Sequence, residues 1–355
     1  MSKIKVAVIG CGTIANAAHI PSYMKIQDKV EIKYFCDIIP ERAEKAVKDY
    51  GCGTAITDYH VALNDPEVQA VSVCTPNYMH CQISCDAMRA GKDVLCEKPA
   101  ARTYQEAQIM QQVQHETGRI LNIGVVNRFN DGVNRIKQYI DQGKLGEIYH
   151  VYVSFRAHRS IPGLGGPFTT KAIAGGGALI DWGVHYLDIV MYCTGDPKPV
   201  TVSGETFSKL GTDMKNYVYT SMWSEMTKDV EHGTYDVEDS VAGLIRTEGP
   251  VITINGAWAE NIGPSETYID FMGTKAGIRL QYGGGFTIYG TENGALTETK
   301  PSYVNTDMFL NEITAFVNDV TSREPLPSRI DVNIKTSQIM QAVYDSAAAH
   351  KEVTL

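Results

Sequence analysis

The chain has 355 residues, of which 43% are hydrophobic and 21% charged, and its formal net charge is −9 at pH 7. At roughly 100–200 residues per domain, this length favours two or three domains, each with its own core. A nucleic-acid-binding face would need clustered Lys and Arg, and a membrane span would need about 18 consecutive apolar residues. The sequence contains neither pattern, so neither a nucleic acid nor a membrane is an expected partner.

As far as Gly124, short apolar runs alternate with amphipathic helical patterns. This alternation is typical of βαβ units, and runs that are apolar at nearly every position suit strands covered on both faces. We therefore expect residues 1–126 to form a doubly wound α/β domain around a parallel sheet. The expected strands are Lys5–Ile9, Val30–Cys36, Ala70–Cys74, Val94–Cys96 and Ile120–Gly124, and the expected helices are Glu41–Tyr50, Met79–Arg89 and Tyr104–His115.

From about Asn127 onward, strand signals dominate. Alternating β-branched or aromatic residues with glycine-rich turns between them predict a largely antiparallel sheet, so we expect residues 127–355 to form an α+β domain. The expected strands are Tyr149–Arg156, Val200–Ser208, Ser240–Arg246, Val251–Trp258, Glu266–Met272 and Gly277–Tyr282. The expected helices are Asp131–Gln142, Phe309–Ser322 and Asn333–His350.

Cysteine usage and the amino terminus bear on the compartment. The sequence has 8 cysteines without a C-x-x-C pair, and several lie inside apolar runs, so we interpret them as reduced core thiols. The apolar stretch Val6–Ile14, followed by the small residues Ala15–Ala17, also resembles a cleaved signal peptide. Because Gly10 and Gly12 interrupt that stretch at a spacing with another explanation, we predict a cytoplasmic location.

That other explanation is a dinucleotide-binding turn. Gly10-Cys11-Gly12-Thr13-Ile14-Ala15 has the G-x-G-x-x-A form between a strand and a helix, so Gly10, Gly12, Thr13 and Ile14 are expected to contact the cofactor. Asp37 ends the second strand 22 residues beyond Ala15, near the offset of the acid that binds the adenosine ribose. A carboxylate there repels a 2′-phosphate, so NAD is favoured over NADP. Alternatively, Asp37 is a turn or cap residue of the following helix.

Polar residues follow two further strands of the expected parallel sheet. The carboxyl ends of such strands face the ligand crevice, so we expect Thr75, Asn77, His80, Glu97 and Lys98 to lie near the cofactor. Outside this context, Glu97 and Lys98 would more often form a surface ion pair of little consequence.

The second domain contains a triple glycine followed by a helix with charged residues. Asp181, His185 and Asp188 recur at helical spacing, so they share one face of a helix that is otherwise apolar. Buried charges usually have a function or a partner. The alternatives are a hydrogen-bonded structural histidine or a metal pair. No third ligand cluster accompanies them, and we expect no metal.

Four motifs together, Gly-x-Gly-x-x-Ala, Thr-Pro-Asn-x-x-His, Glu-Lys-Pro and Gly-Gly-Gly-x-x-x-Asp-x-Gly-x-His-x-x-Asp, resemble the glucose–fructose oxidoreductase / inositol dehydrogenase / rhizopine catabolism (Gfo/Idh/MocA) family. The resemblance implies an N-terminal Rossmann domain, a C-terminal domain with a large, mostly antiparallel open sheet, and NAD(P)-dependent oxidation of a sugar or polyol. It also implies a homodimer or homotetramer assembled through that sheet. By position, Lys98 matches the catalytic lysine, His185 the acid/base histidine and Asp181 its partner, with a cis Lys98–Pro99 bond.

These residue types suit the oxidation of a secondary alcohol. A histidine can remove the hydroxyl proton, and a lysine ammonium can stabilise the developing alkoxide. Asp181 would orient a substrate hydroxyl or bias His185. The segment Arg156–Lys171 is similar to relatives that oxidise the 3-hydroxyl of glucosides or anhydrosugars, and Arg156 is the candidate sugar ligand. Alternatively, this segment is a mobile polar loop.

We therefore predict an NAD-dependent dehydrogenase of a sugar, glycoside or related cyclic polyol, acting on a ring hydroxyl at C3. Three alternatives remain: an inositol dehydrogenase, a redox-neutral enzyme that keeps its NAD during glycoside cleavage, and a non-catalytic NAD or sugar sensor. Retention of Lys98, Asp181 and His185 argues against the sensor, which needs no acid/base residues.

Overall fold

The computed structural model describes residues 3–222, 224 and 228–355. The chain divides into two compact units. The first unit contains Met1–Phe129 and Thr306–Ile334, and the second contains Asn130–Asn305 and Lys335–Leu355. Residues 127–355, expected to form one domain, are thus shared between the units. Within the described chain, no helix has both the length and the apolar character needed to cross a membrane.

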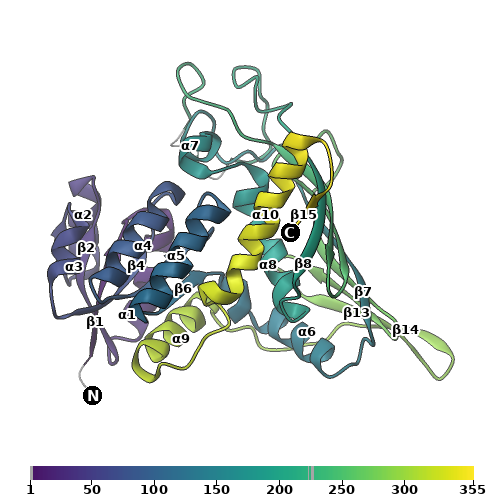
Figure 1. The fold of residues 1–355 in the computed structure, drawn as a ribbon, viewed down its shortest axis with the longest axis horizontal. Coiled ribbons are helices and arrows are strands. Elements are labelled where there is room, and N and C mark those ends of the chain that lie inside the picture. Colours follow the sequence, from purple (N-terminus) through teal and green to yellow (C-terminus); the bar gives the residue numbers. More distant parts are fainter. Residues whose placement is uncertain (1–2, 223, 225–227) are drawn as a thin grey trace. The chain divides into compact units, whose positions relative to one another are not determined.

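A parallel sheet forms the centre of the first unit (Figure 1). Its strands are β1 (Ile4–Ile9), β2 (Val30–Cys36), β3 (Thr54–Ile56), β4 (Val68–Val73), β5 (Asp93–Glu97) and β6 (Leu121–Gly124). In the described residues their spatial order is β3-β2-β1-β4-β5-β6, and every neighbouring pair is parallel. This is the order of doubly wound dinucleotide-binding sheets, in which the order reverses between β1 and β4. The predicted fold class is confirmed for this part of the chain.

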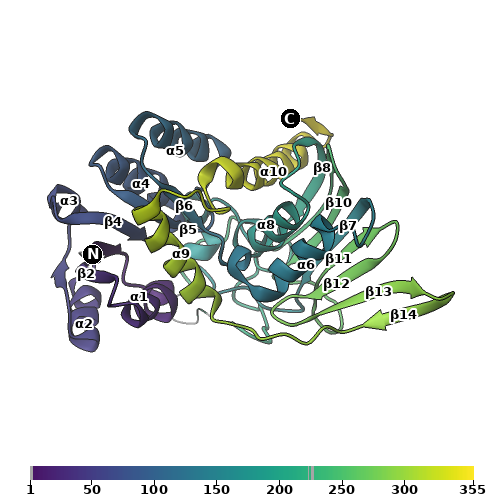
Figure 2. The same cartoon turned by 90° about the horizontal axis from the view of Figure 1, so that it is seen from below.

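Helices cover both faces of this sheet (Figure 2). They are η1 (Ala15–His19), α1 (Ile20–Lys25), α2 (Pro40–Tyr50), α3 (Tyr59–Asn64), η2 (Asn77–Met79), α4 (His80–Arg89), α5 (Tyr104–Thr117), η3 (Val126–Phe129) and α9 (Met308–Ser322). Successive residues of β1 enter different cores: Ala7 and Ile9 pack with α3, α4 and α5, whereas Val6 and Val8 pack with α1, α2 and α9. Burial on both faces explains why these strands are apolar throughout.

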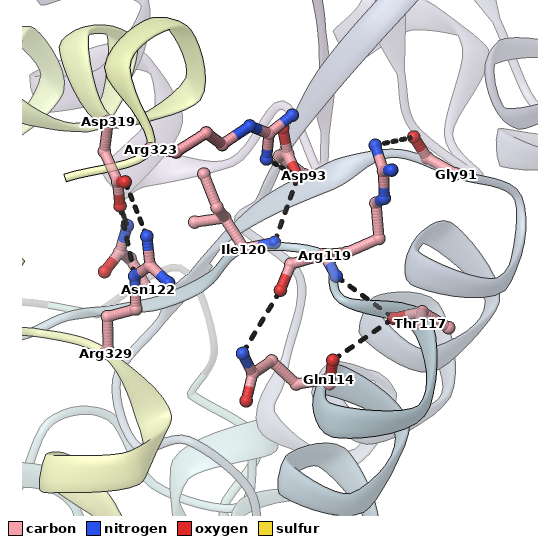
Figure 3. Close-up of polar contacts among 10 residues, drawn as sticks. All are labelled: Gly91, Asp93, Gln114, Thr117, Arg119, Ile120, Asn122, Asp319, Arg323 and Arg329. Atoms are coloured by element: carbon pink, nitrogen blue, oxygen red, sulfur yellow. Dashed lines mark hydrogen bonds and ion pairs between the residues drawn. The ribbon is translucent and has the colours of Figure 1, made fainter. Parts of the chain in front are cut away.

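A buried charge network ties α9 to the edge strand β6 (Figure 3). Asp319 of α9 is buried and accepts hydrogen bonds from the Asn122 side chain at 2.9 Å and from the Arg329 guanidinium at 2.6 Å. Arg323, just beyond α9, donates at 2.9 Å to Asp93, which also accepts from the main-chain N–H of Ile120. These contacts explain why residues 306–334 belong to the first unit although they lie far in the sequence from its other residues, 1–129.

The second unit is built on a larger sheet. Its strands are β7 (Ile148–Arg156), β8 (Pro199–Phe207), β9 (Ser240–Thr247), β10 (Val251–Ala257), β11 (Glu266–Gly273), β12 (Gly277–Gln281), β13 (Phe286–Glu292), β14 (Ala295–Thr299) and β15 (Val353–Thr354). Within the described ranges the order is β14-β13-β12-β11-β7-β10-β9-β8-β15, and the pairs are antiparallel except for β7 with β10. The mostly antiparallel sheet was predicted, whereas the β13–β14 hairpin was not.

One face of this second sheet is packed against helices (Figure 2). The helical segments of the unit are α6 (Asp131–Asp141), η4 (Pro167–Thr169), α7 (Lys171–Ala174), η5 (Leu179–Gly183), α8 (Val184–Cys193) and most of α10 (Ile330–Ala349). Val153 and Phe155 of β7 share a core with residues of α6, α8 and α10. Because side chains alternate along a strand, Tyr152 and Arg156 lie on the opposite face.

Candidate active site

The glycines of the first turn have different functions. Gly10 follows β1 with a φ of +93°, and a Cβ there would lie 2.6 Å from the carbonyl oxygen of Cys74. The fold itself therefore requires Gly10. A Cβ on Gly12 would meet no atom within 4 Å, so the main chain at Gly12 faces open space where a pyrophosphate could approach. Thr13 is exposed and Ile14 half-buried at the start of the following helix.

Asp37 lies at the carboxyl end of β2 beside this turn. Its Oδ2 accepts the N–H of Cys11 at 2.9 Å, and its Oδ1 accepts the N–H of Ile39 at 2.9 Å. The carboxylate thus holds the glycine turn and the start of the next helix, as the alternative interpretation of Asp37 required. Each carboxylate oxygen has a further lone pair, so this role does not prevent Asp37 from accepting a ribose hydroxyl. Its neighbour Ile38 is 82% exposed.

Residues after β4 lie at the same carboxyl-terminal edge of the sheet. The Thr75 hydroxyl is buried and has no hydrogen-bond partner among the described residues, while Asn77 is half-buried at the start of η2. His80 is fully buried, and its Nδ1 and Nε2 lie 2.8 Å from the carbonyl oxygens of Pro99 and Thr75, respectively. Burial lowers the pKa of His80, although these hydrogen bonds oppose the shift. His80 therefore joins two main-chain segments and has no exposed surface to offer a cofactor.

Glu97 is the last residue of β5 and Lys98 follows it, and the buried position of Glu97 does not suit a surface ion pair. Glu97 is buried; its Oε1 lies 2.8 Å from Nε2 of His19, and its Oε2 accepts the main-chain N–H of Lys98 at 3.1 Å. Burial alone would raise the pKa of Glu97, but the hydrogen bond with His19 and the charges of His19 and Lys98 outweigh it and lower that pKa. Lys98 is half-buried, and the Lys98–Pro99 bond is cis as expected.

In the second unit, the triple glycine approaches other protein segments closely. Gly175 ends α7 with a φ of +91°. A Cβ on Gly176 would overlap the hydroxyl of Tyr344, and one on Gly177 would overlap the carbonyl oxygen of Glu238. These glycines therefore allow η5 to start tightly against α10 and against the segment before β9.

Glu238 fixes the beginning of this helix, and its role was not predicted from the sequence. Its Oε2 accepts the N–H of Gly177 at 2.9 Å, and its Oε1 accepts the N–H of Leu179 at 3.0 Å and the hydroxyl of Tyr344 at 2.8 Å. Burial raises the pKa of Glu238, although these hydrogen bonds oppose the shift. The sequence around Glu238, which lies between two strands, contains no pattern that predicts the capping of a helix about 60 residues earlier in the chain.

Asp181 and His185 project from the helix that Glu238 anchors. Both are half-buried, whereas Leu179, Ile180, Val184 and Leu187 between and beside them are buried. Asp181 lies in the π-helical turn η5, a geometry that recurs at functional sites. Its Oδ2 accepts the indole N–H of the buried Trp258 at 3.3 Å. The His185 ring lies 6.4 Å from that of Tyr282.

Asp188 differs from these two residues because it is buried. The predicted helical spacing of the three residues is correct, but their burial differs: Asp181 and His185 are half-buried, whereas Asp188 is buried. Over the residues that the structure describes, no group of three or more His, Cys, Asp and Glu side chains could hold a metal ion.

Arg156, the candidate sugar ligand, is paired with two carboxylates. It is on the face of the second sheet opposite Phe155, which packs against Tyr186 of α8, the helix that carries His185. Its guanidinium donates to Glu260 at 2.7 Å and to Glu266 at 3.0 Å. These carboxylates raise the pKa of Arg156. Because side chains alternate along β7, the Arg156 side chain points away from the sheet face that packs against α8, the helix with His185.

The segment after Arg156 is packed against a second long connection. Ile161 and Leu164 are buried in a small core with Val237 and Trp258. The main chain of this segment is also bonded to residues between β8 and β9; for example, the N–H of Asp229 donates to the carbonyl of Leu164 at 2.7 Å. The segment is thus part of a folded lobe with buried apolar residues of its own.

The predicted residues therefore fall into two groups. The first unit brings together the glycine turn, Asp37, Thr75, Asn77 and the Glu97-Lys98 segment along one edge of its sheet. The second unit holds Asp181 and His185 on one helix, with Trp258 beside Asp181. Chemically, the first group suits binding of a dinucleotide, and the second supplies a carboxylate and an imidazole suited to proton transfer.

Comparison with known proteins gives matches over nearly the whole chain. A model of the oxidoreductase family with an NAD-binding Rossmann fold (GFO/IDH/MocA) matches residues 4–125, and the GFO/IDH/MocA C-terminal domain matches residues 133–279. The D-glucoside 3-dehydrogenase of Escherichia coli K12 is 31% identical, covering 100% of this chain and 98% of its own length. The levoglucosan dehydrogenase of Pseudarthrobacter phenanthrenivorans is 28% identical, covering 79% of this chain and 74% of its own length.

Solved structures have the same fold. A levoglucosan dehydrogenase in complex with NADH and levoglucosan superposes with a TM-score of 0.83. That comparison covers 99% of both chains at 20% sequence identity.

Proposed function

The chain belongs to the GFO/IDH/MocA family of oxidoreductases, and from this premise we propose that it is an NAD-dependent dehydrogenase that oxidises the C3 hydroxyl of a glucoside or a related sugar. The half-buried pair Asp181 and His185, on a helix whose neighbouring side chains are buried, carries the proposal. A structural histidine in such a helix would be expected to be buried with its neighbours. The substrate class follows from the two relatives, which are named for a glucoside and for levoglucosan.

The residues of the first turn fit a dinucleotide. A Cβ on Gly12 would meet no protein atom within 4 Å, which leaves its main chain open to a pyrophosphate, and the unpartnered Thr75 hydroxyl supplies a hydrogen-bonding group at the same edge of the sheet. Asp37 would accept the ribose hydroxyls and repel a 2′-phosphate, which favours NAD over NADP. We also propose that Thr13, Ile14 and Asn77 contact the cofactor. For His80 and Glu97, whose polar atoms bond within the protein, we propose positioning roles in place of direct contacts.

The proposed chemistry assigns one task to each remaining residue. His185 accepts the proton of the substrate hydroxyl, and the Lys98 ammonium stabilises the negative charge that develops on the same oxygen. Asp181, held by the indole of Trp258, orients a substrate hydroxyl or the imidazole. The nicotinamide accepts the hydride from the carbinol carbon. Arg156 is left out of the sugar site, because its guanidinium is bonded to Glu260 and Glu266 on the other face of the sheet.

We further propose that the chain forms a homodimer or homotetramer through the face of the second sheet that carries Arg156. By strand register, Phe207 and Tyr289 lie on this face, and they are 41% and 45% exposed. Exposed aromatic side chains on a sheet favour association with another apolar surface. The eight free cysteines suit the reducing environment of the cytoplasm, which we propose as the location.

The decisive experiment combines a substrate panel with three variants. The protein is incubated with NAD or NADP and with methyl β-D-glucoside, levoglucosan, glucose or myo-inositol, and reduction is followed at the NADH absorption band. We expect Lys98→Ala and His185→Ala each to lower kcat/KM by roughly 10²–10⁴-fold while retaining NADH binding. The matched control is Lys45→Ala, which removes an exposed lysine of α2 and should stay within about threefold of the native protein.

Each alternative has a distinct outcome. Reduction with myo-inositol but with no glucoside would identify an inositol dehydrogenase. NAD that co-purifies with the protein, with no free NADH released during glycoside cleavage, would identify the redox-neutral enzyme. Binding without reduction or isotope exchange for any sugar would identify the sensor and overturn the proposal.

A further inference from the structure

A buried histidine lies directly behind the segment that carries Lys98. His19 is the last residue of the π-helical turn η1, which follows the glycine-rich turn, and it is buried. Its Nε2 lies 2.8 Å from Oε1 of Glu97, and its Nδ1 lies 3.2 Å from the hydroxyl of Ser72 in β4. The Ser72 hydroxyl is in turn 2.8 Å from the hydroxyl of Tyr23. No function proposed above uses His19.

The contact with Glu97 determines which ring nitrogen of His19 carries a hydrogen. Glu97, whose pKa is lowered, is an ionised acceptor, so Nε2 of His19 must carry a hydrogen and donate it. The Nδ1 of the same ring lies 3.2 Å from the Ser72 hydroxyl, which in turn lies 2.8 Å from the Tyr23 hydroxyl. Nε2 carries its hydrogen whether or not Nδ1 does. His19 therefore presents one defined N–H to Glu97.

Glu97 also accepts a hydrogen bond from the main chain of Lys98. Its second oxygen accepts the main-chain N–H of Lys98 at 3.1 Å, so the carboxylate bridges the His19 ring and the lysine backbone. Gly124 of the neighbouring strand β6 leaves room for the carboxylate, since a Cβ there would lie 3.2 Å from it. On the far side of Lys98, the carbonyl of Pro99 is held by His80. The segment is thus fixed at both ends.

His19 also belongs to the helix that starts at the cofactor turn. The N–H of Asn16 donates to the carbonyl of Gly12 at 3.2 Å, and its side chain donates to the carbonyls of Cys11 and Gly12. A path of main-chain and side-chain hydrogen bonds therefore leads from the glycine turn through η1 to His19, Glu97 and Lys98. Both ends of this path lie in the first unit.

We propose that His19 is a positioning residue for Lys98: by donating Nε2–H to Glu97, it fixes the Lys98 backbone relative to the turn that binds the dinucleotide. This inference rests on the proposed function, in which Lys98 contacts the reacting oxygen. Misplacement of such a group by about 1 Å can lower a rate roughly a hundredfold without weakening binding. His19 should therefore affect kcat much more than the binding of either ligand.

Three substitutions separate the two ring nitrogens. His19→Gln places an amide N–H near the position of Nε2, His19→Asn places its polar atoms near Nδ1, and His19→Phe removes both. We expect His19→Phe and His19→Asn to lower kcat by about tenfold to a hundredfold. The KM for the sugar substrate and the Kd for NADH should stay within about threefold of native. Gln should recover most of the loss. Ser72→Ala, which removes only the Nδ1 partner, is the matched control and should stay near native.

A second measurement does not require turnover. The rate at which trinitrobenzenesulfonate modifies Lys98, measured by mass spectrometry on the full chain, reports the environment of its amine. We expect this rate to change in His19→Phe and His19→Asn and to return to the native value in His19→Gln. Thermal unfolding shows whether each variant is folded; if Phe is not, the comparison of Gln with Asn decides.

Two results would overturn the inference. One is native kcat and native Lys98 reactivity in folded His19→Asn or His19→Phe, and the other is equal activity of the Asn and Gln variants. Lys98→Ala is measured in parallel to distinguish this failure from failure of the proposed function. If Lys98→Ala retains activity, the role of Lys98 is wrong; if it is inactive while the His19 variants are native, only the role of His19 is wrong.

Discussion

Glu97 in the first unit and Glu238 in the second are both buried carboxylates that hold a segment with a proposed catalytic residue, yet their pKa values shift in opposite directions. Glu97 faces His19 and lies near the Lys98 charge, and its pKa is lowered despite burial. Glu238 accepts hydrogen bonds from the N–H groups of Gly177 and Leu179 and from Tyr344, and burial still raises its pKa. Charged partners thus compensate for desolvation where neutral dipoles do not.

The same contrast applies to the stabilising networks of the two units. Asp319 in the first unit pairs with Arg329, whereas Asp239 in the second accepts the main-chain N–H groups of Lys209, Leu210 and Gly211. The first unit therefore holds long-range segments together through charge pairs. The second uses carboxylates to satisfy main-chain groups of a lobe that has little regular structure of its own.

The largest expected effect comes from the charge pair of the first unit. Asp319→Ala leaves Arg329 and the Asn122 side chain without their buried partner, and we expect the free energy of unfolding to fall by about 3–5 kcal/mol. Urea unfolding measures it. The matched control is Lys25→Ala, which removes an exposed pair with Asp307, the N-cap residue of α9, and should cost about 1 kcal/mol or less. Equal losses in both variants would show that the buried charge pair contributes no more than the exposed one.

The glycines of the two motifs give the next largest effect. Gly177→Ala inserts a methyl group where the Glu238 carbonyl lies, so we expect a loss of about 1–3 kcal/mol or more of unfolding free energy. Gly12→Ala meets no protein atom and should leave stability unchanged within about 0.5 kcal/mol. It should instead weaken NADH binding, measured by fluorescence titration. Unchanged NADH affinity in Gly12→Ala would remove the pyrophosphate from this position.

Glu238→Gln should have an intermediate effect. One amide oxygen can replace Oε1, but the NH₂ group then faces the N–H of Gly177 and leaves that donor unsatisfied. We expect a loss of about 1–3 kcal/mol in unfolding free energy and a lower kcat, since the helix with Asp181 and His185 loses part of its anchor. Tyr344→Phe is the milder control, because it removes one of the three donors. A fully active and stable Glu238→Gln would show that the anchor is dispensable.

The smallest expected effect is the pH dependence of stability, and its sign differs between the two acids. The pKa of Glu97 is lowered in the fold, so its contribution is complete above the unfolded value of about 4.5 and is lost as the pH falls below it. The pKa of Glu238 is raised, so the native state binds its proton more tightly and stability increases as the pH falls from neutral toward 4.5. Glu97→Gln should remove the first slope and Glu238→Gln the second, as measured by unfolding between pH 3 and 7. Slopes of the same sign would contradict these assignments.

Several features of the fold could be predicted because local pattern specifies them. Apolar runs marked the strands of the first sheet, and alternation marked β7 and β10 of the second. The short strand β3 (Thr54–Ile56) was missed because three residues carry no period. The β13–β14 hairpin was missed although Asn293-Gly294 is a typical turn sequence, with both residues at positive φ. Strand alternation also places the Arg156 side chain on the sheet face opposite Phe155.

The sequence alone therefore determined the glycine turn, the acid after β2, the Glu-Lys-Pro segment and the spacing of Asp181 and His185, since each is a pattern within a short stretch of chain. Only the tertiary structure decided that His19 contacts Glu97, that Glu238 caps the helix with His185, and that Asp319 bonds with Asn122 of β6. The physical reason is that these contacts join residues far apart in the chain. Strand order and packing determine which distant residues meet, and the spacing of apolar residues does not.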